Sequence, residues 1–225
     1  MTIHFQKELE HLKKRILSLG AMVEERVHMA IKAIETRDGD LALKIVNADH
    51  EIDEIEVEVE EDCLKVLALH QPVAVDLRFI AAVIKINNDL ERVGDEAVNI
   101  AERVANISKR APMKIPFDFS IMAEKTEAML NNSLDALVNL DADLAGEVCL
   151  ADDEIDDMNR DIYDIVKDAI RSQPENAGYL INLLLVSRHL ERIADHATNI
   201  AEEVIYMIEG MIHRHTNSRP QQGQG

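Results

Sequence analysis

The sequence predicts an all-α fold built from two tandem, sequence-related three-helix bundles with six long helices. Apolar residues recur at three- and four-residue spacing through most of the 225 residues, which indicates amphipathic helices. Only 8 Gly and 5 Pro are present, too few for the many short connections of a sandwich, barrel or propeller. An internal repeat then divides the helices into two equivalent sets.

The first half of the chain contains three helical segments with two breaks between them. Gly39 is expected to take the left-handed conformation that ends the first helix, and Asp40 to cap the second. Pro72 breaks the second helix, and Asp76 is expected to cap the third. The apolar positions place these helices near residues 9–34, 40–70 and 76–104.

Three more helical segments follow, near residues 119–140, 143–172 and 175–213. A proline-containing stretch separates them from the first half, and the chain ends in residues rich in Gln and Gly. The expected division is a first bundle over 1–111, a linker over 112–118, a second bundle over 119–215 and a disordered tail over 216–225.

The two halves repeat one motif at a fixed separation. Residues 90–102 align without a gap with residues 190–202, 100 positions later. Eight of the first twelve pairs are identical, and the shared pattern is Leu-Glu-Arg-(Val/Ile)-(Gly/Ala)-Asp-x-Ala-x-Asn-Ile-Ala. The Gln-Pro turn at 71–72 recurs at 173–174, and Asp-Leu-Ala at 40–42 recurs at 143–145. Because order, turn and motif recur together, the sequence predicts a duplicated three-helix unit.

An acidic stripe runs along the third helix of each half. Glu91 and Asp95 are four residues apart and therefore share one face, as do Glu191 and Asp195 in the second half. A helix face that is merely exposed to solvent requires polar residues, but it does not require the same polar residue types in both halves. The recurrence of the same residue types in two diverged halves favours a specific role over simple solvation.

The second helix of each half supplies further carboxylates when it folds back about its Gln-Pro turn. Asp49 and Asp53 then face the first stripe. Asp152 and Asp156 face the second. Converging carboxylates repel one another unless cations or protons offset their charge, and oxygen-rich sites suit Mg, Mn or Fe. The predicted metal ligands are Asp49, Asp53, Glu91, Asp95, Asp152, Asp156, Glu191 and Asp195.

Arginines and histidines near these stripes offer other interpretations. Salt bridges from Arg92, Arg103 and Arg192 would neutralise the carboxylates in a purely structural scaffold. His189 and His196 replace acidic residues of the first repeat, so the second site could be richer in nitrogen and accept zinc. Ordinary histidines at the edge of the stripe are the alternative.

Composition and missing motifs exclude several functions. The 24 Lys+Arg against 43 Asp+Glu give a net charge of -19, which disfavours nucleic acid and insertion at an anionic membrane. The sequence contains no phosphate-binding loop and no nucleophile motif. Cys63 lies among acidic neighbours that raise a thiol pKa, and with Cys149 it indicates reduced thiols in a cytoplasmic protein. We therefore expect a non-enzyme.

The duplicated motif resembles the PhoU family of phosphate-specific transport system accessory proteins. The turn Gln71-Pro72-Val73-Ala74-Val75-Asp76-Leu77-Arg78 is also similar to the turn of that family, and the resemblance covers nearly the whole chain except the tail. It implies two three-helix bundles and a cytoplasmic negative regulator of the phosphate-starvation (Pho) response and of phosphate uptake. In the second half Ala177-Gly178-Tyr179 stands in place of Asp76-Leu77-Arg78, so a partner that contacts Asp76 or Arg78 would contact the first half only.

The resemblance also implies partners and a metal. It implies an adaptor between the ATPase subunit of the phosphate ABC transporter and the sensor histidine kinase PhoR, commonly as a homodimer. It implies multinuclear iron or zinc bound through the Glu-x-x-x-Asp elements at Glu91 and Asp95 and at Glu191 and Asp195, while the residue chemistry alone also suits manganese or magnesium. A metal-carboxylate helical-bundle enzyme or iron store is the alternative, although the stripe lies opposite the apolar face and predicts an exposed site.

Overall fold

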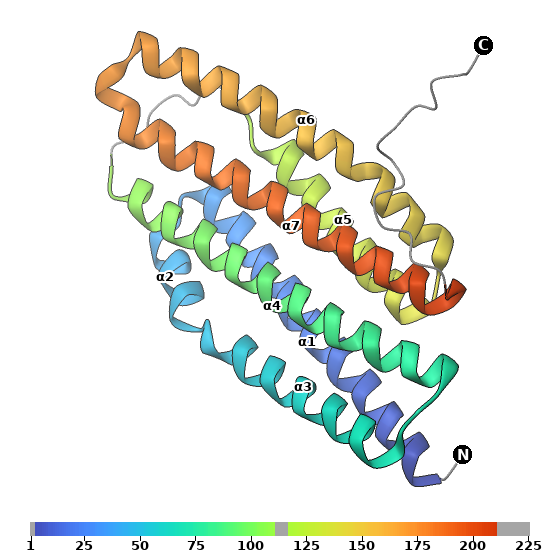
Figure 1. The fold of residues 1–225 in the computed structure, drawn as a ribbon. Coiled ribbons are helices and arrows are strands. Elements are labelled where there is room, and N and C mark those ends of the chain that lie inside the picture. The colour runs from blue at the N-terminus through green and yellow to red at the C-terminus, as the bar shows by residue number, and fades with distance from the viewer. Residues whose placement is uncertain (1–2, 111–116, 211–225) are drawn as a thin grey trace, which may run out of the picture.

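The computed structural model describes residues 3–110 and 117–210. These residues form seven α-helices and one short 3-10 helix, and the all-α, duplicated architecture is confirmed (Figure 1). The predicted residues 112–116 of the linker and everything after residue 210 lie outside the described part. The elements are α1 (Ile3–Thr36), α2 (Gly39–Asn47), α3 (His50–His70), α4 (Ala74–Ser108), α5 (Ser120–Asn139), α6 (Ala142–Ser172), η1 (Pro174–Asn176) and α7 (Ala177–Glu209).

The two repeats, α1–α4 and α5–α7, lie side by side along their length. Helices α4 and α7 run antiparallel along the middle of the molecule, with α3 on one outer edge and α6 on the other (Figure 1). Most apolar side chains of α4 and α7 are buried, and the buried apolar residues of both repeats form one continuous cluster. Burial of this cluster is the main favourable contribution to folding. None of the described helices combines the length and the apolar character needed to cross a membrane.

All three predicted helix caps are wrong by a few residues. Arg37, not Gly39, takes the left-handed conformation, with φ 53°, and the side chain of Asp38, not Asp40, accepts hydrogen bonds from the first backbone N–H groups of α2. Gly39 is instead needed for close packing, because a Cβ there would lie 2.5 Å from Ser108 Oγ. Asp76 lies in the first turn of α4 and does not cap it.

The second predicted helix is interrupted, so that α2 and α3 are separate helices. The interruption at Ala48 and Asp49 coincides with the buried side chain of Arg26, whose Nη1 donates to the Ile45 carbonyl at 3.4 Å and whose Nη2 donates to Glu51 at 3.1 Å. The equivalent position in the second repeat is Met129, 103 residues later, and there α6 continues without a break. The Arg26 guanidinium therefore forms hydrogen bonds on both sides of the interruption, to the Ile45 carbonyl before it and to the Glu51 carboxylate after it.

Arg26→Met is expected to lower the free energy of unfolding by about 2 kcal/mol, because hydrogen bonds to charged groups contribute roughly 1.5–3 kcal/mol. Urea unfolding followed by circular dichroism measures the change. Met129→Leu, a volume-conserving change at the equivalent position, is the control and should cost less than about 1.5 kcal/mol. Equal losses in the two variants would show that Arg26 contributes only packing.

Candidate metal-binding carboxylate clusters

Helices α3 and α4 bring Asp49, Asp53, Glu91 and Asp95 together, and we call this group the first cluster. Burial raises the pKa of Asp95, and the charges of Asp49 and Asp53 on the facing helix raise it further. Burial also raises the pKa of Glu91, with further contributions from Asp95 and Asp53 that Arg92 partly offsets. The mutual electrostatic effect shows that the four carboxylates lie close to one another.

Helices α6 and α7 build the equivalent second cluster from Asp152, Asp156, Glu191 and Asp195. Asp195 is partly exposed, but desolvation by the surrounding helices, followed by the charges of the other three carboxylates, raises its pKa to about 6. Burial and Asp156 also raise the pKa of Asp152, although its carboxylate accepts a 3.3 Å hydrogen bond from the Thr198 hydroxyl. Both clusters therefore contain like charges that neighbouring arginines offset only in part.

The clusters are less exposed than the sequence predicted. Glu91 and Asp95 are half-buried, as are Asp152 and Glu191, whereas Asp53 and Asp195 remain at the surface. The reason is that α4 packs between α3 and α7, so neighbouring helices cover both sides of its polar stripe. Gly94 permits the close approach of α3, because a Cβ there would lie 3.0 Å from Ile52 Cδ1.

Arginines do not neutralise these carboxylates in the way that a salt-bridged scaffold requires. Arg92 Nε lies 4.0 Å from Glu91, while Arg103 Nη2 lies 3.0 Å from its sequence neighbour Glu102. Arg192 Nη1 lies 2.9 Å from Glu96, in the other repeat and outside either cluster. Of these three arginines, only Arg92 therefore reaches a cluster carboxylate.

The two histidines of the second repeat pair with carboxylates of the first repeat. His189 Nδ1 lies 2.6 Å from Glu96 Oε2, and His196 Nδ1 lies 2.8 Å from Asp89 Oδ1. The four positions are reciprocal, because His189 is the counterpart of Asp89 and His196 is the counterpart of Glu96, each 100 residues later. An exact duplication would have placed acid against acid at both contacts. The two replacements therefore place an imidazole opposite a carboxylate at both contacts of the α4–α7 interface.

Further groups lie beside the predicted ligands. Glu102 contributes to raising the pKa of Asp49, after burial and Asp53, and Glu56 contributes to that of Glu91. Burial, then Glu202 and Asp152, raise the pKa of Cys149 to about 11, so its thiol is protonated at neutral pH. Glu56 and Glu102 lie on the same helical stripes as the predicted ligands. Their spacing in the sequence could therefore have identified them as neighbours of the clusters.

The chemistry of the two clusters fits a hard cation. Each presents carboxylate oxygens from two helices, and the raised pKa values show repulsion that a bound cation would remove. In the part of the chain that the structure describes, no three His, Cys, Asp or Glu side chains already surround a common point as metal ligands would. The clusters are thus open arrangements of carboxylates, and ligation would require side-chain rotation.

Asp195→Asn should raise the melting temperature of the metal-free protein near neutral pH. The Asp195 pKa is about 6 in the folded protein against an ordinary value of 3.8, so the folded state binds the extra proton. The resulting loss of stability is absent below pH 3.8, grows as pH rises, and is complete above about pH 6. Differential scanning calorimetry at about pH 7.5 and at about pH 3.5 measures the effect.

The control for this prediction is Asp161→Asn, which removes one negative charge from an exposed position of α6. Comparison of the two variants distinguishes reduced repulsion within the second cluster from the effect of a general reduction of the -19 net charge. The same gain at both values of pH, or the same gain in both variants, would contradict the assignment of the effect to Asp195.

Two related helical repeats, each with a half-buried carboxylate cluster, define a class of duplicated helical-bundle proteins. Residues 16–104 and 119–204 each match the PhoU domain. The chain belongs to the PhoU family.

Individual relatives agree with this assignment along most of the chain. A protein of Clostridium acetobutylicum, described as a phosphate-specific transport system accessory protein PhoU homolog, is 35% identical over 92% of this chain and 94% of its own length. The crystal structure of PhoU from Pseudomonas aeruginosa has 33% identity, covers 92% of this chain and 100% of its own, and gives a TM-score of 0.89. A phosphate transport system regulatory protein PhoU from Streptococcus pneumoniae has 30% identity and a TM-score of 0.81, over 92% and 98% of the two chains.

Proposed function

We propose that this chain is a negative regulator of the phosphate-starvation response and of phosphate uptake. In this role it is a cytoplasmic, metal-binding adaptor between the ATPase of a phosphate ABC transporter and a sensor histidine kinase of the PhoR type. The observation that carries the proposal is the match of both repeats, over residues 16–104 and 119–204, to a family whose relatives are described as phosphate-specific transport system accessory proteins. The adaptor acts by binding other proteins, commonly as a homodimer, and not by catalysis.

The carboxylate clusters support a metal-dependent adaptor. A cation bound between α3 and α4, or between α6 and α7, would offset the repulsion within a cluster and fix the two helices together. Because His189 and His196 already pair with Glu96 and Asp89, the ligands offered are mainly oxygens. Carboxylate oxygens suit magnesium and manganese and are also found in the carboxylate-rich iron sites of helical bundles, whereas the imidazoles that would favour zinc are already paired.

The same carboxylates support the enzyme or iron-store alternative less well. Catalysis at a metal needs open coordination positions in a site that excludes water, whereas Asp53 and Asp195 are at the surface. Ferroxidase or oxygenase turnover by the purified protein would nevertheless overturn the adaptor proposal.

Deletion of the gene tests the regulatory role. We expect alkaline phosphatase to be expressed in high phosphate in the deletion strain, and the full-length gene supplied on a plasmid to restore repression. A Glu91→Gln and Asp95→Asn version supplied in the same way tests whether the first cluster is needed. Continued repression in the deletion strain would refute the proposed function.

A further inference from the structure

A mainly apolar groove lies at one end of the molecule, where α1 and α4 begin and α5 and α7 end. Its volume is about 510 Å³, and both repeats contribute to its wall. Glu10, Lys13, Asp76 and Arg78 stand among its lining residues and balance one another in charge. The groove is distinct from the carboxylate clusters. Its apolar wall includes Leu9, Leu17, Phe79, Leu140 and Ile208.

An exposed apolar turn continues this groove on the outside of the first repeat. Leu69, Val73 and Val75 between α3 and α4 are 65%, 75% and 61% exposed, and Val75 also lines the groove. The corresponding turn of the second repeat has Glu175 and Asn176 instead. Contiguous exposed apolar side chains typically mark an interaction surface, and here only the first repeat carries one.

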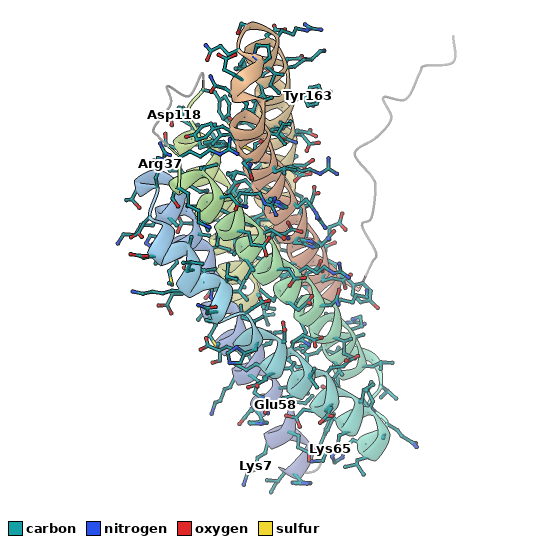
Figure 2. The ribbon with its side chains drawn as sticks, turned by 90° about the vertical axis from the view of Figure 1, so that its left-hand side faces the viewer. Lys7, Arg37, Glu58, Lys65, Asp118 and Tyr163 are labelled. Carbon is teal, nitrogen blue, oxygen red and sulfur yellow. The ribbon has the colours of Figure 1, made fainter. Side chains whose placement is uncertain are left out.

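The internal repeat shows what occupies the equivalent place at the other end of the molecule. Leu140 corresponds to Arg37, 103 residues earlier; both end a helix in the left-handed conformation, with φ 52° and 53°. The Arg37 guanidinium donates to the carbonyls of Ile107 and Arg110, at 2.8 and 3.2 Å, and lies 5.6 Å from the centre of the Tyr179 ring. Figure 2 shows Arg37 at the end of the molecule far from Lys7.

The groove contains the counterparts of these residues, but it has no arginine in the place of Arg37. Phe79 stands in place of Tyr179, Met207 in place of Ile107, and Leu140, 51% exposed, in place of Arg37. Within the described residues no side chain donates a hydrogen bond to the Met207 carbonyl, near the C-terminal end of α7, where the helix dipole favours a cation. Arg78 does not take the place of Arg37, because its guanidinium lies beside Gly210. At the other end of the molecule the Arg110 guanidinium lies beside Gly178 in the same way.

We propose that this groove binds a segment of a partner protein that presents apolar side chains and an arginine. Its apolar side chains cover Val75, Phe79 and Leu140, and its arginine occupies the place that Arg37 fills at the other end. The C-terminal end of α7, beside the Met207 carbonyl, favours such a cation. The identity of the partner rests on the function proposed above: it is the transporter ATPase or the histidine kinase.

Leu140→Arg tests this docking site, because it supplies the missing guanidinium from within the chain. Arg37 shows that arginine is compatible with this backbone conformation. Binding of the purified ATPase and of the cytoplasmic part of the kinase is measured separately by biolayer interferometry with the full-length chain. We expect one of the two to bind Leu140→Arg at least about tenfold more weakly, a typical effect for a residue central to an interface. Val138→Arg, on the same helix outside the groove and 44% exposed in the wild type, should bind as the wild type does.

Each remaining outcome overturns the docking proposal. If the wild type binds a partner and Leu140→Arg binds it equally well, the adaptor function stands and the groove is not the site. If the wild type binds neither partner, both proposals fail. If truncation after Gly210 strengthens binding tenfold or more, the chain's own residues 211–225 occupy the groove. If Leu140→Arg alone converts dimers to monomers in sedimentation equilibrium, a second copy occupies it.

Discussion

Replacing Glu91 with Gln and Asp95 with Asn together should reduce the metal content of the purified protein by about half, because one of two equivalent carboxylate sites loses two of its ligands. Glu191→Gln with Asp195→Asn should have the same effect, and the four substitutions together should abolish binding. Inductively coupled plasma mass spectrometry of protein purified without added metal provides the measurement. The prediction follows from the two clusters being built in the same way on α4 and α7.

A matched pair on α6 controls for the loss of negative charge. Asp164 and Asp168 are exposed and four residues apart. They form ion pairs with Lys167 and Arg171, and they belong to neither carboxylate cluster. Their replacement by asparagine should leave the metal content unchanged. The cluster variants should remain folded, since neutral side chains remove the repulsion that raises the pKa of Asp95. Unchanged metal content in folded cluster variants would refute the assigned ligands.

Glu96→Ala should produce the largest loss of stability among the polar substitutions considered, about 2–3 kcal/mol, because it removes charged hydrogen bonds. Glu96 is 2% exposed, and its carboxylate contacts His189 at 2.6 Å and Arg192 at 2.9 Å. Burial raises its pKa, but the His189 hydrogen bond and the Arg192 charge outweigh burial, and the net shift is downward. Its contribution is therefore present above the ordinary value of 4.5 and is lost as pH falls through the lowered pKa.

The reciprocal arrangement offers a sharper version of this test. Glu96→His combined with His189→Glu reverses the pair while keeping one carboxylate and one imidazole. Urea unfolding should show that the double variant loses less stability than the sum of the two single variants. Strict additivity would mean that the contact between α4 and α7 does not depend on this pair.

The fold and most of each cluster could be predicted because both depend on local sequence. Helical periodicity located the helices, and the four-residue spacing of Glu91 and Asp95 placed them on one face. The Gln-Pro turn fixed the antiparallel pairing of neighbouring helices, which was enough to bring Asp49 and Asp53 towards that face. Their role as metal ligands remains a prediction.

Contacts between elements distant in sequence could not be predicted in the same way. The break between α2 and α3 coincides with hydrogen bonds from Arg26, which lies on another helix, and the local sequence at the break does not indicate it. The partners of His189 and His196 depend on the antiparallel register of α4 against α7. The repeat did contain an indication of these contacts, since histidine replaces an acidic residue at two positions seven residues apart. Only the register of α4 against α7, however, shows which carboxylates the histidines contact.

The central claim, that the chain acts by linking transporter and kinase, is tested most directly by co-purification from cells grown in high phosphate. A tagged full-length chain, expressed from its own promoter and shown to support repression, is recovered after mild cross-linking, and the bound proteins are identified by mass spectrometry. The adaptor account predicts that both the transporter ATPase and the sensor histidine kinase are recovered with the chain. Recovery of neither protein from cells in which repression is intact would contradict it.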